Sequence, residues 1–541
     1  MLNSLLNFFD RYAGNVNRRD LFRKAGLLTA PALLSRRAGA AASSISPGLH
    51  VGPNIFQSIG VKPIVNCRGT FTIIGGSLEL PEVRAAQEAA AQHYVQLDEL
   101  MDAIGQRLSE LTGAEWGMIG SGCAASLAHC TAACLAGGNP DLHVRIPDLT
   151  GFPKDEVVIP KHSRNVYDAA VRSTGVKIIE AGTPEEFELV MGPRVSMVYV
   201  LAGPAAEKDP LNYDVIYRVA KQRNIPVLVD AAAEVLTIPN VHLQRGATVV
   251  AYSGGKCIRG PQCAGFILGR KDLMRAAWVH SAPHHGYSRS MKVGKEEAMG
   301  MLMAVEMWTK RDHAAEWKQW LAWLDHINQR VSSIPGVKGS IFETKELSNH
   351  SPVLNIRWDG SALGIFGEQV AEQLLNGEPR IALSGGGRRR GGSGGETGVS
   401  ITAYMMQPGD DKIVAEKLHA TLSNVKKSAP KTPAPPAADL TGEWDVRVDY
   451  LASTSEHKLF LRQDSGRIVG THQGDFISRD LYGSIDGDIV KFASQVGESH
   501  GFALGYRFTG TVQGDSMSGD LDLGEYRSAK WSASRHQFRR A

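Results

Sequence analysis

One lysine stands in a local sequence that could give it covalent chemistry. The apolar run 249–252 leads into Ser-Gly-Gly and then Lys256, and a Gly-Pro turn follows at 260–261. A lysine held in a tight backbone pocket loses hydration, and a desolvated amine is more often neutral and nucleophilic. Lys256 is therefore a candidate Schiff-base former. A lone Ser-x-x-Lys segment is more often an ordinary surface turn, so the interpretation depends on the surrounding chain.

A carboxylate at the end of an upstream strand strengthens the case for this lysine. The apolar run 225–229 ends at Asp230 and continues into three alanines. An aspartate in such a position is often only a helix cap. Paired with Lys256, it also suits the pyridinium nitrogen of pyridoxal 5'-phosphate (PLP). The pair predicts a PLP site in which Asp230 and Lys256 are the catalytic residues.

A glycine-rich turn at 120–122 could hold the phosphate of that cofactor. Ser121, Gly122 and Cys123 open a run of small residues that predicts a short helix. The free backbone N–H groups and the dipole of a helix N-terminus favour a phosphate. Ser121 and Ser253 would each add a hydroxyl. A Gly-Ser-Gly turn is common, so this prediction rests on the aspartate and lysine that follow it.

The segments 229–232 and 252–262 resemble the fold-type I PLP enzymes. Among these, they are similar to the selenocysteine synthase-like group that includes D-glucosaminate-6-phosphate ammonia-lyase. The resemblance spans about residues 55–425 and leaves out both ends. It implies a large α/β domain with a mostly parallel sheet and flanking helices, an α+β small domain, and PLP as cofactor. It also implies a homodimer or higher homo-oligomer that acts on a small amino substrate.

The same resemblance implies a reaction and further site residues. It favours α,β-elimination from an amino acid or amino-sugar acid, while an aminotransferase or racemase would use the same residues. His162, after the strand 157–160, would lie beside the cofactor ring. Arg289 and Lys292 would bind an anionic group of the substrate, in some members from the neighbouring subunit, and Arg357 would bind a carboxylate. For each of these residues, an ordinary structural or solvent-exposed role is the alternative.

Strand and helix patterns alternate through the middle of the chain, which predicts a parallel sheet with crossover helices. The strands are expected at 157–160, 177–179, 195–201 and 227–230. Ligands in such sheets lie at the carboxyl ends of strands, where Asp230 and the loop before Lys256 fall. Residues 296–330 predict one long helix whose tryptophans are interpreted as core. A strand at 353–358 and a helix at 367–375 suit the small domain.

The C-terminal part of the chain changes character. A Pro-rich spacer at 428–436 precedes a series of short strands, and regular short antiparallel strands predict a small barrel or sandwich. No catalytic constellation is visible there. A non-catalytic protein with this β-domain as its working part is the competing hypothesis of another class, and the Asp230 and Lys256 pair argues against it. The predicted boundaries are 1–42 for a signal segment, 43–295 for the large domain, 296–426 for the small domain, 427–439 for the linker and 440–541 for the β-domain.

Composition and the N-terminal sequence indicate which other classes of protein the chain could belong to. The 541 residues carry a formal net charge of +3, too small to indicate nucleic-acid binding. No apolar run is long enough to span a bilayer. Arg18-Arg19, a mildly apolar stretch and a small-residue cleavage region resemble a twin-arginine signal, which predicts an exported or periplasmic protein. Six cysteines do not form a disulfide scaffold; Cys130 and Cys134 could touch, with buried free thiols as the favoured alternative. His284-His285 lacks a visible third ligand, so no metal site is predicted.

Overall fold

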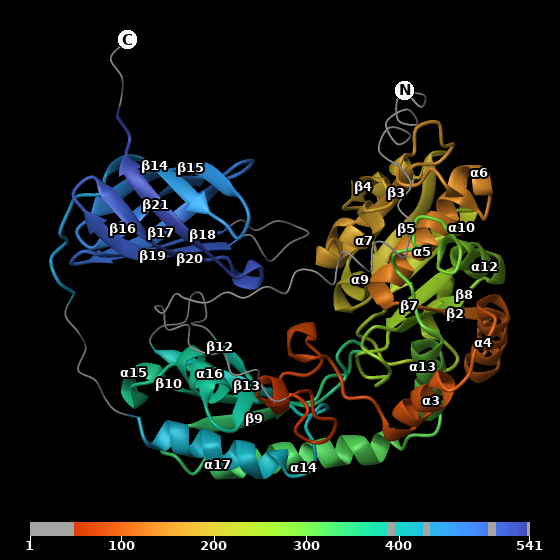
Figure 1. Cartoon of the computed structure of the whole chain (residues 1–541), viewed down its shortest axis with the longest axis horizontal. Helices are drawn as coiled ribbons and strands as arrows, with labels where there is room; N and C mark the ends of the chain where they lie inside the picture. Colours follow the sequence, from red (N-terminus) through yellow and green to blue (C-terminus); the bar gives the residue numbers. More distant parts are fainter. Residues whose placement is uncertain (1–47, 387–394, 426–432, 496–504, 538–541) are drawn as a thin grey trace, which may run out of the picture. The chain divides into compact units, whose positions relative to one another are not determined.

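The computed structural model describes residues 48–386, 395–425, 433–495 and 505–537 (Figure 1). The predicted signal segment and most of the basic glycine-rich loop near 384–395 lie outside these ranges. Residues 1–63 and 64–541 form separate units. The described part of the first contains one 3-10 turn, Gln57–Ile59, in which the Ser58 hydroxyl donates to the Ile55 carbonyl. Among the described residues, no helix has the length and apolar character needed to cross a membrane.

A seven-stranded mixed sheet forms the large domain, as predicted. Its order is β2-β8-β7-β6-β5-β3-β4, and every pairing is parallel except the two made by β8. The inner strands are nearly all apolar and buried, as expected for a parallel sheet covered by helices, whereas the edge strand β4 is partly exposed. Their bounds are β2 Trp116–Gly120, β3 Glu156–Pro160, β4 Lys177–Ala181, β5 Val195–Leu201, β6 Val227–Asp230, β7 Val249–Ser253 and β8 Gly265–Gly269.

Helices next to this sheet share its core. The helix that follows β2, α5, is mostly buried, because alanines and cysteines leave little side chain to project into water. The main helices of this part are α3 Pro81–Ala91, α4 Leu97–Thr112, α5 Cys123–Ala136, α8 Pro184–Val190, α10 Tyr213–Gln222, α12 Lys271–His280 and α13 Lys295–Trp308. The core extends from Leu80 to Trp308, so α13 packs with the large domain although the predicted boundary lies at its first residue.

The prediction of one long helix over 296–330 was wrong. The chain forms α13 and then α14 (His313–Val331), separated by a break at 309–312. Asp312 is the N-cap of α14 and accepts a hydrogen bond from the Ala315 N–H at 2.9 Å, so a new helix start replaces continuation. Of the four tryptophans, Trp308 joins the large-domain core, while the three on α14 are only half-buried.

The small domain is an antiparallel sheet of order β12-β13-β10-β9 with its own core. It also takes β1, which lies before the large domain in the chain and pairs in parallel with β11 through Ile64 and Arg380. Cys67, next to β1, is fully buried in this core. The elements are β1 Ile64–Asn66, β9 Lys338–Phe342, β10 Val353–Asp359, β11 Arg380–Ala382, β12 Ser384–Gly386, β13 Glu396–Thr402, α16 Gly367–Asn376 and α17 Asp410–Ser423.

The β-domain, drawn in blue in Figure 1, is a closed eight-stranded antiparallel barrel in which each strand pairs with its neighbours in sequence. Pairing of the first strand with the last closes it, which removes both sheet edges. Side chains from alternate positions fill the inside. The strands are β14 Gly442–Asp449, β15 Thr454–Asp464, β16 Arg467–Gln473, β17 Ser478–Asp486, β18 Ile489–Gln495, β19 Gly505–Gln513, β20 Ser516–Asp522 and β21 Ser528–Arg535.

Candidate active site

Two neighbouring parallel strands place Asp230 and the Lys256 turn at one edge of the large sheet. Asp230 is the last residue of β6 and pairs with Ala251 on β7. Ser253 is the last residue of β7, and Lys256 follows in the turn behind it. Both strands run the same way, so both chemical groups fall at carboxyl ends, where the sequence predicted them.

The turn that carries Lys256 is fixed by its backbone. The Gly254 N–H donates to Ala264 O and the Gly260 N–H to Gly254 O, each at 2.9 Å. A Cβ atom added at Gly254 would lie 2.6 Å from the Ala264 carbonyl oxygen, and one at Gly255 would collide with the Gln262 side chain. Backbone atoms thus exclude a side chain at position 254, while the contact at position 255 is with a side chain that can move, so Gly254 is the residue that fixes the turn under the lysine.

Three donors hold the Asp230 carboxylate in one orientation. The Tyr199 hydroxyl donates to Oδ2 at 2.9 Å, and the Cys123 thiol and the Ala232 N–H donate to Oδ1 at 3.5 and 3.1 Å. Asn165 donates in turn to the Tyr199 hydroxyl at 2.9 Å, which commits the tyrosine proton to the carboxylate. Asp230 itself is only 2% exposed. A buried carboxylate supported in this way is well placed to bind a ring N–H.

Electrostatic effects show that Asp230, Cys123 and Lys256 occupy one small region. Burial, and then the Asp230 charge, raise the pKa of the Cys123 thiol well above its usual range, while the Lys256 charge acts on the same thiol in the opposite direction. Burial and Asp230 likewise raise the pKa of the Tyr199 hydroxyl. Both groups therefore stay protonated near neutral pH, which is what a hydrogen-bond donor to Asp230 requires.

The N-terminus of α5 lies beside this region through Cys123. Gly122 has a φ of 101° and is the N-cap, and it offers no side-chain bond to the first turn. The first N–H groups of a helix have no partner within the helix, so they remain available to an anion. A Cβ at Gly265 would lie 2.8 Å from the Cys123 nitrogen, so β8 needs glycine where the helix starts.

Ser121 has another partner in the structure. Its hydroxyl donates to the Met291 carbonyl at 2.9 Å. This bond joins the turn before α5 to the segment that holds Arg289 and Lys292, both of which are exposed. Neither cation has an ion-pair partner within the described ranges, so both are available to a substrate anion. The phosphate role of Ser121 and the substrate roles of Arg289 and Lys292 remain predictions.

His162 lies directly after β3, in the 3-10 turn Lys161–Ser163. One ring nitrogen, Nε2, is 3.0 Å from the Leu211 carbonyl, which fixes it as the donor, and Nδ1 is 3.0 Å from the Ser163 hydroxyl. These bonds fix the plane of the imidazole. The side chain can thus offer a flat face to a ring, and its role beside the cofactor stays a prediction.

Arg357 lies apart from the groups described above. It is exposed on β10, and its Nη1 and Cδ lie over Gly398 of the neighbouring strand β13. Its contacts are therefore within the small-domain sheet. They lend no support to the predicted carboxylate-binding role, which stays a prediction.

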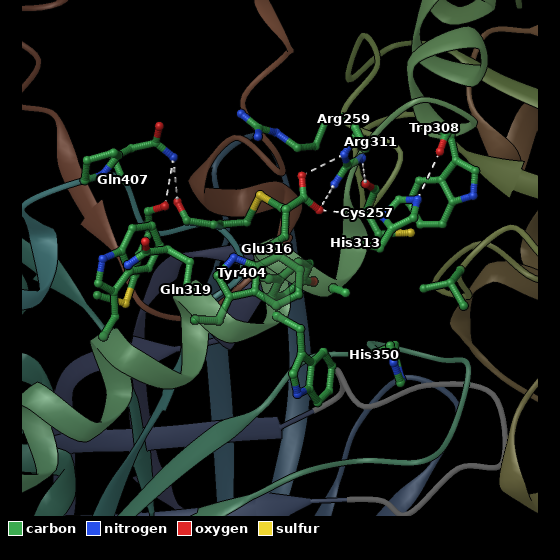
Figure 2. Close-up of a pocket in the computed structure, with 18 residues that line it drawn as sticks. Cys257, Arg259, Trp308, Arg311, His313, Glu316, Gln319, His350, Tyr404 and Gln407 are labelled. Atoms are coloured by element: carbon green, nitrogen blue, oxygen red, sulfur yellow. Dashed lines mark hydrogen bonds and ion pairs between the residues drawn. The ribbon is translucent and has the colours of Figure 1, made fainter.

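A cavity of about 590 Å³ borders the turn just after Lys256 (Figure 2). Cys257 and Arg259 from the turn line it, together with tryptophans of α14 and Tyr404. Arg259 has a φ of 59°, unusual for a residue with a side chain, and its Nε donates to the Leu78 carbonyl at 2.9 Å. Burial, and then the neighbouring Arg311 charge, lower the pKa of Arg259. This strained cation was missed in the sequence, although it lies inside the motif that pointed to Lys256.

Arg311, unlike Arg259, is neutralised within the cavity wall. Its Nε and Nη2 donate to the two carboxylate oxygens of Glu316 at 2.9 and 2.8 Å (Figure 2). Burial opposes ionisation of Glu316, but hydrogen bonds from His313 and Arg311 outweigh it and lower the pKa to about 2. The cavity therefore keeps the positive charge of Arg259 next to an aromatic wall.

The cysteines and one group of potential metal ligands can also be examined in the structure. All six cysteines are free, Cys130 and Cys134 included. Within the described ranges, one group of carboxylates and imidazole could hold an ion, formed by Glu443, Asp445 and His536 on the barrel. Lys458 forms ion pairs with both carboxylates, so the group is already balanced without a metal.

The residues at the sheet edge fit PLP. A buried carboxylate with fixed proton donors suits the pyridine nitrogen, and the open first turn of α5 suits the phosphate. A lysine on a rigid turn within electrostatic reach of Cys123 suits the covalent attachment. These features come from three different strand ends, and the fold brings them together.

Comparison with known proteins gives several relatives, although no family model matches. The chain is 31% identical over 338 residues to a D-glucosaminate-6-phosphate ammonia lyase of Salmonella typhimurium (strain 14028s / SGSC 2262), covering 61% of this chain and 89% of the relative. It is 30% identical over 344 residues to a 5'-C-glycyluridine monooxygenase-decarboxylase of a Streptomyces species, covering 61% and 83%. A solved structure of a D-glucosaminate-6-phosphate ammonia-lyase superposes with a TM-score of 0.60 at 29% identity, covering 69% of this chain and 98% of that one.

Proposed function

We propose, because the chain belongs to the fold-type I PLP-dependent family of D-glucosaminate-6-phosphate ammonia lyase, that it is a PLP-dependent lyase that removes ammonia from an amino-sugar acid by α,β-elimination. The observation that carries the proposal is the Asp230 carboxylate, held by Tyr199 and Cys123 beside the Lys256 turn. A binding protein without catalysis would not require this buried, fully hydrogen-bonded carboxylate at the end of β6.

The residues of the site divide the chemistry between them. PLP, when bound, supplies an electron sink for negative charge at the substrate Cα. Asp230 would accept the hydrogen bond of the protonated ring nitrogen, and Tyr199 and Cys123 hold the carboxylate in the required orientation. Lys256 would anchor the cofactor, and its amine would act as the base that takes the proton from the substrate Cα.

Further groups would hold the two ends of the cofactor and substrate. The first-turn N–H groups of α5, with Ser253, would bind the cofactor phosphate, and His162 would lie against the ring. Arg289 and Lys292 would bind the acidic groups of the substrate, since both are exposed next to the turn before α5. The relative's name includes a phosphorylated sugar acid, and Arg259 in the adjoining cavity adds a third cation for such a substrate.

The reaction class can be tested directly. The purified holoenzyme should convert a 2-amino-3-hydroxy sugar acid, such as D-glucosaminate 6-phosphate, into ammonia and a 2-oxo-3-deoxy acid. The Cα–H and the β-hydroxyl leave together as water, and hydrolysis then releases ammonia, so no oxo-acid acceptor is consumed. Turnover that requires an added 2-oxo acid would instead identify an aminotransferase, and loss of Cα chirality without ammonia would identify a racemase.

Location and assembly are further parts of the proposal. The Arg18-Arg19 pair supports export by the twin-arginine route, which carries folded proteins and so allows cofactor insertion beforehand. The exposed side chains of Arg289 and Lys292 support a homodimer or higher homo-oligomer, because they could reach the active site of an adjacent subunit.

A further inference from the structure

One end of the barrel interior is lined by polar side chains, here called the polar wall, and the rest of the interior is apolar. Toward the end that carries the loops 450–453, 474–477 and 523–527, five consecutive strands each place a polar or aromatic side chain inside. They are His457 on β15, His472 on β16, Arg479 on β17, Ser494 on β18 and Tyr506 on β19. The rest of the interior is apolar, with Trp444, Trp531 and Phe508 among its largest members. Apolar side chains alone would stabilise the inside of a small barrel, so stability does not explain why this end of the interior is polar.

Most of this wall is satisfied by its own hydrogen bonds. His457 Nδ1 and His472 Nε2 share one at 2.9 Å, and His472 Nδ1 is 2.7 Å from the Ser494 hydroxyl. Burial lowers the pKa of both imidazoles, so both are neutral near pH 7. The remaining nitrogen of His457, Nε2, is 3.7 Å from Asp475, beyond hydrogen-bond distance.

Arg479 is the exception, because it is a buried charge without a counter-ion. It is 6% exposed, its Nε has no hydrogen-bond partner, and Nη1 reaches only the Ile477 carbonyl at 3.3 Å. Its guanidinium lies over the Tyr506 ring, 4.9 Å from the centroid. No carboxylate forms an ion pair with it among the described residues. A buried guanidinium cannot lose its proton and is costly unless paired, so the site lacks an anion.

A cavity of about 410 Å³ opens at this end of the barrel, and one of its lining residues is Tyr506, whose ring contacts the Arg479 guanidinium. Tyr450 and Tyr506 line it with their hydroxyls 3.5 Å apart. Burial, then the Tyr506 hydroxyl and the Asp475 charge, raise the pKa of Tyr450, and the Arg479 charge opposes them. Leu451 and Leu523 supply apolar surface. The volume is in the range of small-molecule sites, and a closed eight-stranded barrel can hold one small ligand.

We propose that the barrel binds a small organic acid with an apolar body, whose carboxylate pairs with Arg479 and the Tyr450 and Tyr506 hydroxyls. The body then lies against Leu451 and Leu523 at the mouth. This site is separate from the Lys256 site in sequence and in chemistry: one provides covalent attachment, the other a buried cation and phenols. The protein therefore combines a catalytic part with a reversible carboxylate sensor or carrier.

Calorimetric titration of the full-length holoenzyme tests this with matched probes. Phenylacetate, phenylbutyrate and octanoate are each compared with the neutral amide of the same acid. At least one carboxylate should bind roughly tenfold or more tightly than its amide, as expected for a charge-assisted contact in a buried site. Arg479→Gln should reduce its affinity to that of the amide and leave the amide unchanged. Arg507→Gln is the control and should bind as wild type, because Arg507 lies on the outer face of β19 and pairs with Asp522 at 3.5 Å.

Three results would overturn the proposal. One is that no carboxylate in the set binds better than its amide at millimolar concentration. Another is that the preference survives Arg479→Gln in protein whose circular dichroism and melting temperature match wild type, which would place the ligand elsewhere, for example at the Lys256 site. If Arg479→Gln does not fold, the Tyr450→Phe and Tyr506→Phe double variant keeps the buried cation; its carboxylate affinity should fall several-fold, and an unchanged value would equally exclude the site.

Discussion

Asp230→Asn separates the charge of the carboxylate from its shape. The native side chain accepts hydrogen bonds from Tyr199, Cys123 and Ala232. An amide keeps one acceptor oxygen and replaces the other with an NH2 group, which cannot accept the Tyr199 proton. Asn165 already donates to the Tyr199 oxygen, so that proton loses its acceptor in the buried network. The variant also loses the negative charge that would keep a proton on the ring nitrogen.

The size of the effect follows from the lost contact. A hydrogen bond to a charged group contributes about 1.5–3 kcal/mol, which corresponds to a kcat lower by roughly 10- to 160-fold. Tyr199→Phe keeps the negative charge and the other two donors to it, so its kcat should fall by less. Asp230→Asn should therefore be the more damaging of the two.

Ammonia release at saturating substrate measures kcat, and absorbance and borohydride labelling show that PLP remains attached. Asp214→Asn is the matched control, since that aspartate is 78% exposed and its one ion pair within the described ranges is with Arg245, so the kcat of the variant should not change. An Asp230→Asn enzyme that binds PLP and turns over as fast as wild type would refute the role assigned to the carboxylate. So would a Tyr199→Phe enzyme slower than Asp230→Asn.

Three other results are expected. Borohydride reduction followed by peptide mapping should place the cofactor on Lys256, and Lys256→Ala should incorporate none and lose turnover; label on another lysine would contradict the assignment. Changing Arg18 and Arg19 to lysine should leave PLP-loaded protein in the cytoplasm, whereas continued export would exclude the twin-arginine route. Burial, then the charges of His457 and Arg479, lower the pKa of His472 to about 3. Between pH 6.5 and about 3 the His472 side chain is therefore protonated in the unfolded chain but not in the folded one. The free energy of unfolding falls as the pH falls through that window. At pH 5 the loss is about 2 kcal/mol, and His472→Gln should flatten the decrease of melting temperature between pH 7 and pH 5.

The sequence predicted the parts of the fold whose pattern is local. Strand ends at Asp230 and Ser253, the helix start at Cys123 and the β-rich character of the C-terminal domain were all expected and are present. Two barrel strands, β17 and β21, have sequences that do not predict a strand on their own. In β17 the inward positions include Arg479 and Gly483, and in β21 two of the inward positions are alanines, so apolar alternation is weak in both. Their strand form depends on neighbours on either side, which a single-segment pattern does not contain.

The active-site partners were harder to predict because they depend on spatial proximity. Nothing near Tyr199 in the sequence indicates that it donates to Asp230, because its sequence context is that of an ordinary buried strand. The Ser121 bond to Met291 joins segments 170 residues apart. Arg259 was within reach of sequence reasoning, because an arginine before Gly-Pro in the lysine turn is itself unusual, but its left-handed backbone is visible only in three dimensions.

The pairing of β1 with β11 has a consequence for synthesis of the chain. The two-stranded sheet β1-β11 needs residue 64 and residue 380 together, so it cannot form until most of the enzyme has left the ribosome. Closing such a long loop is slow compared with forming adjacent strands, whereas seven of the eight barrel pairings are hairpins. The nascent chain thus exposes an incomplete catalytic body for a long interval, during which premature translocation or proteolysis would be damaging. A route that exports only finished, cofactor-loaded protein matches this order of assembly.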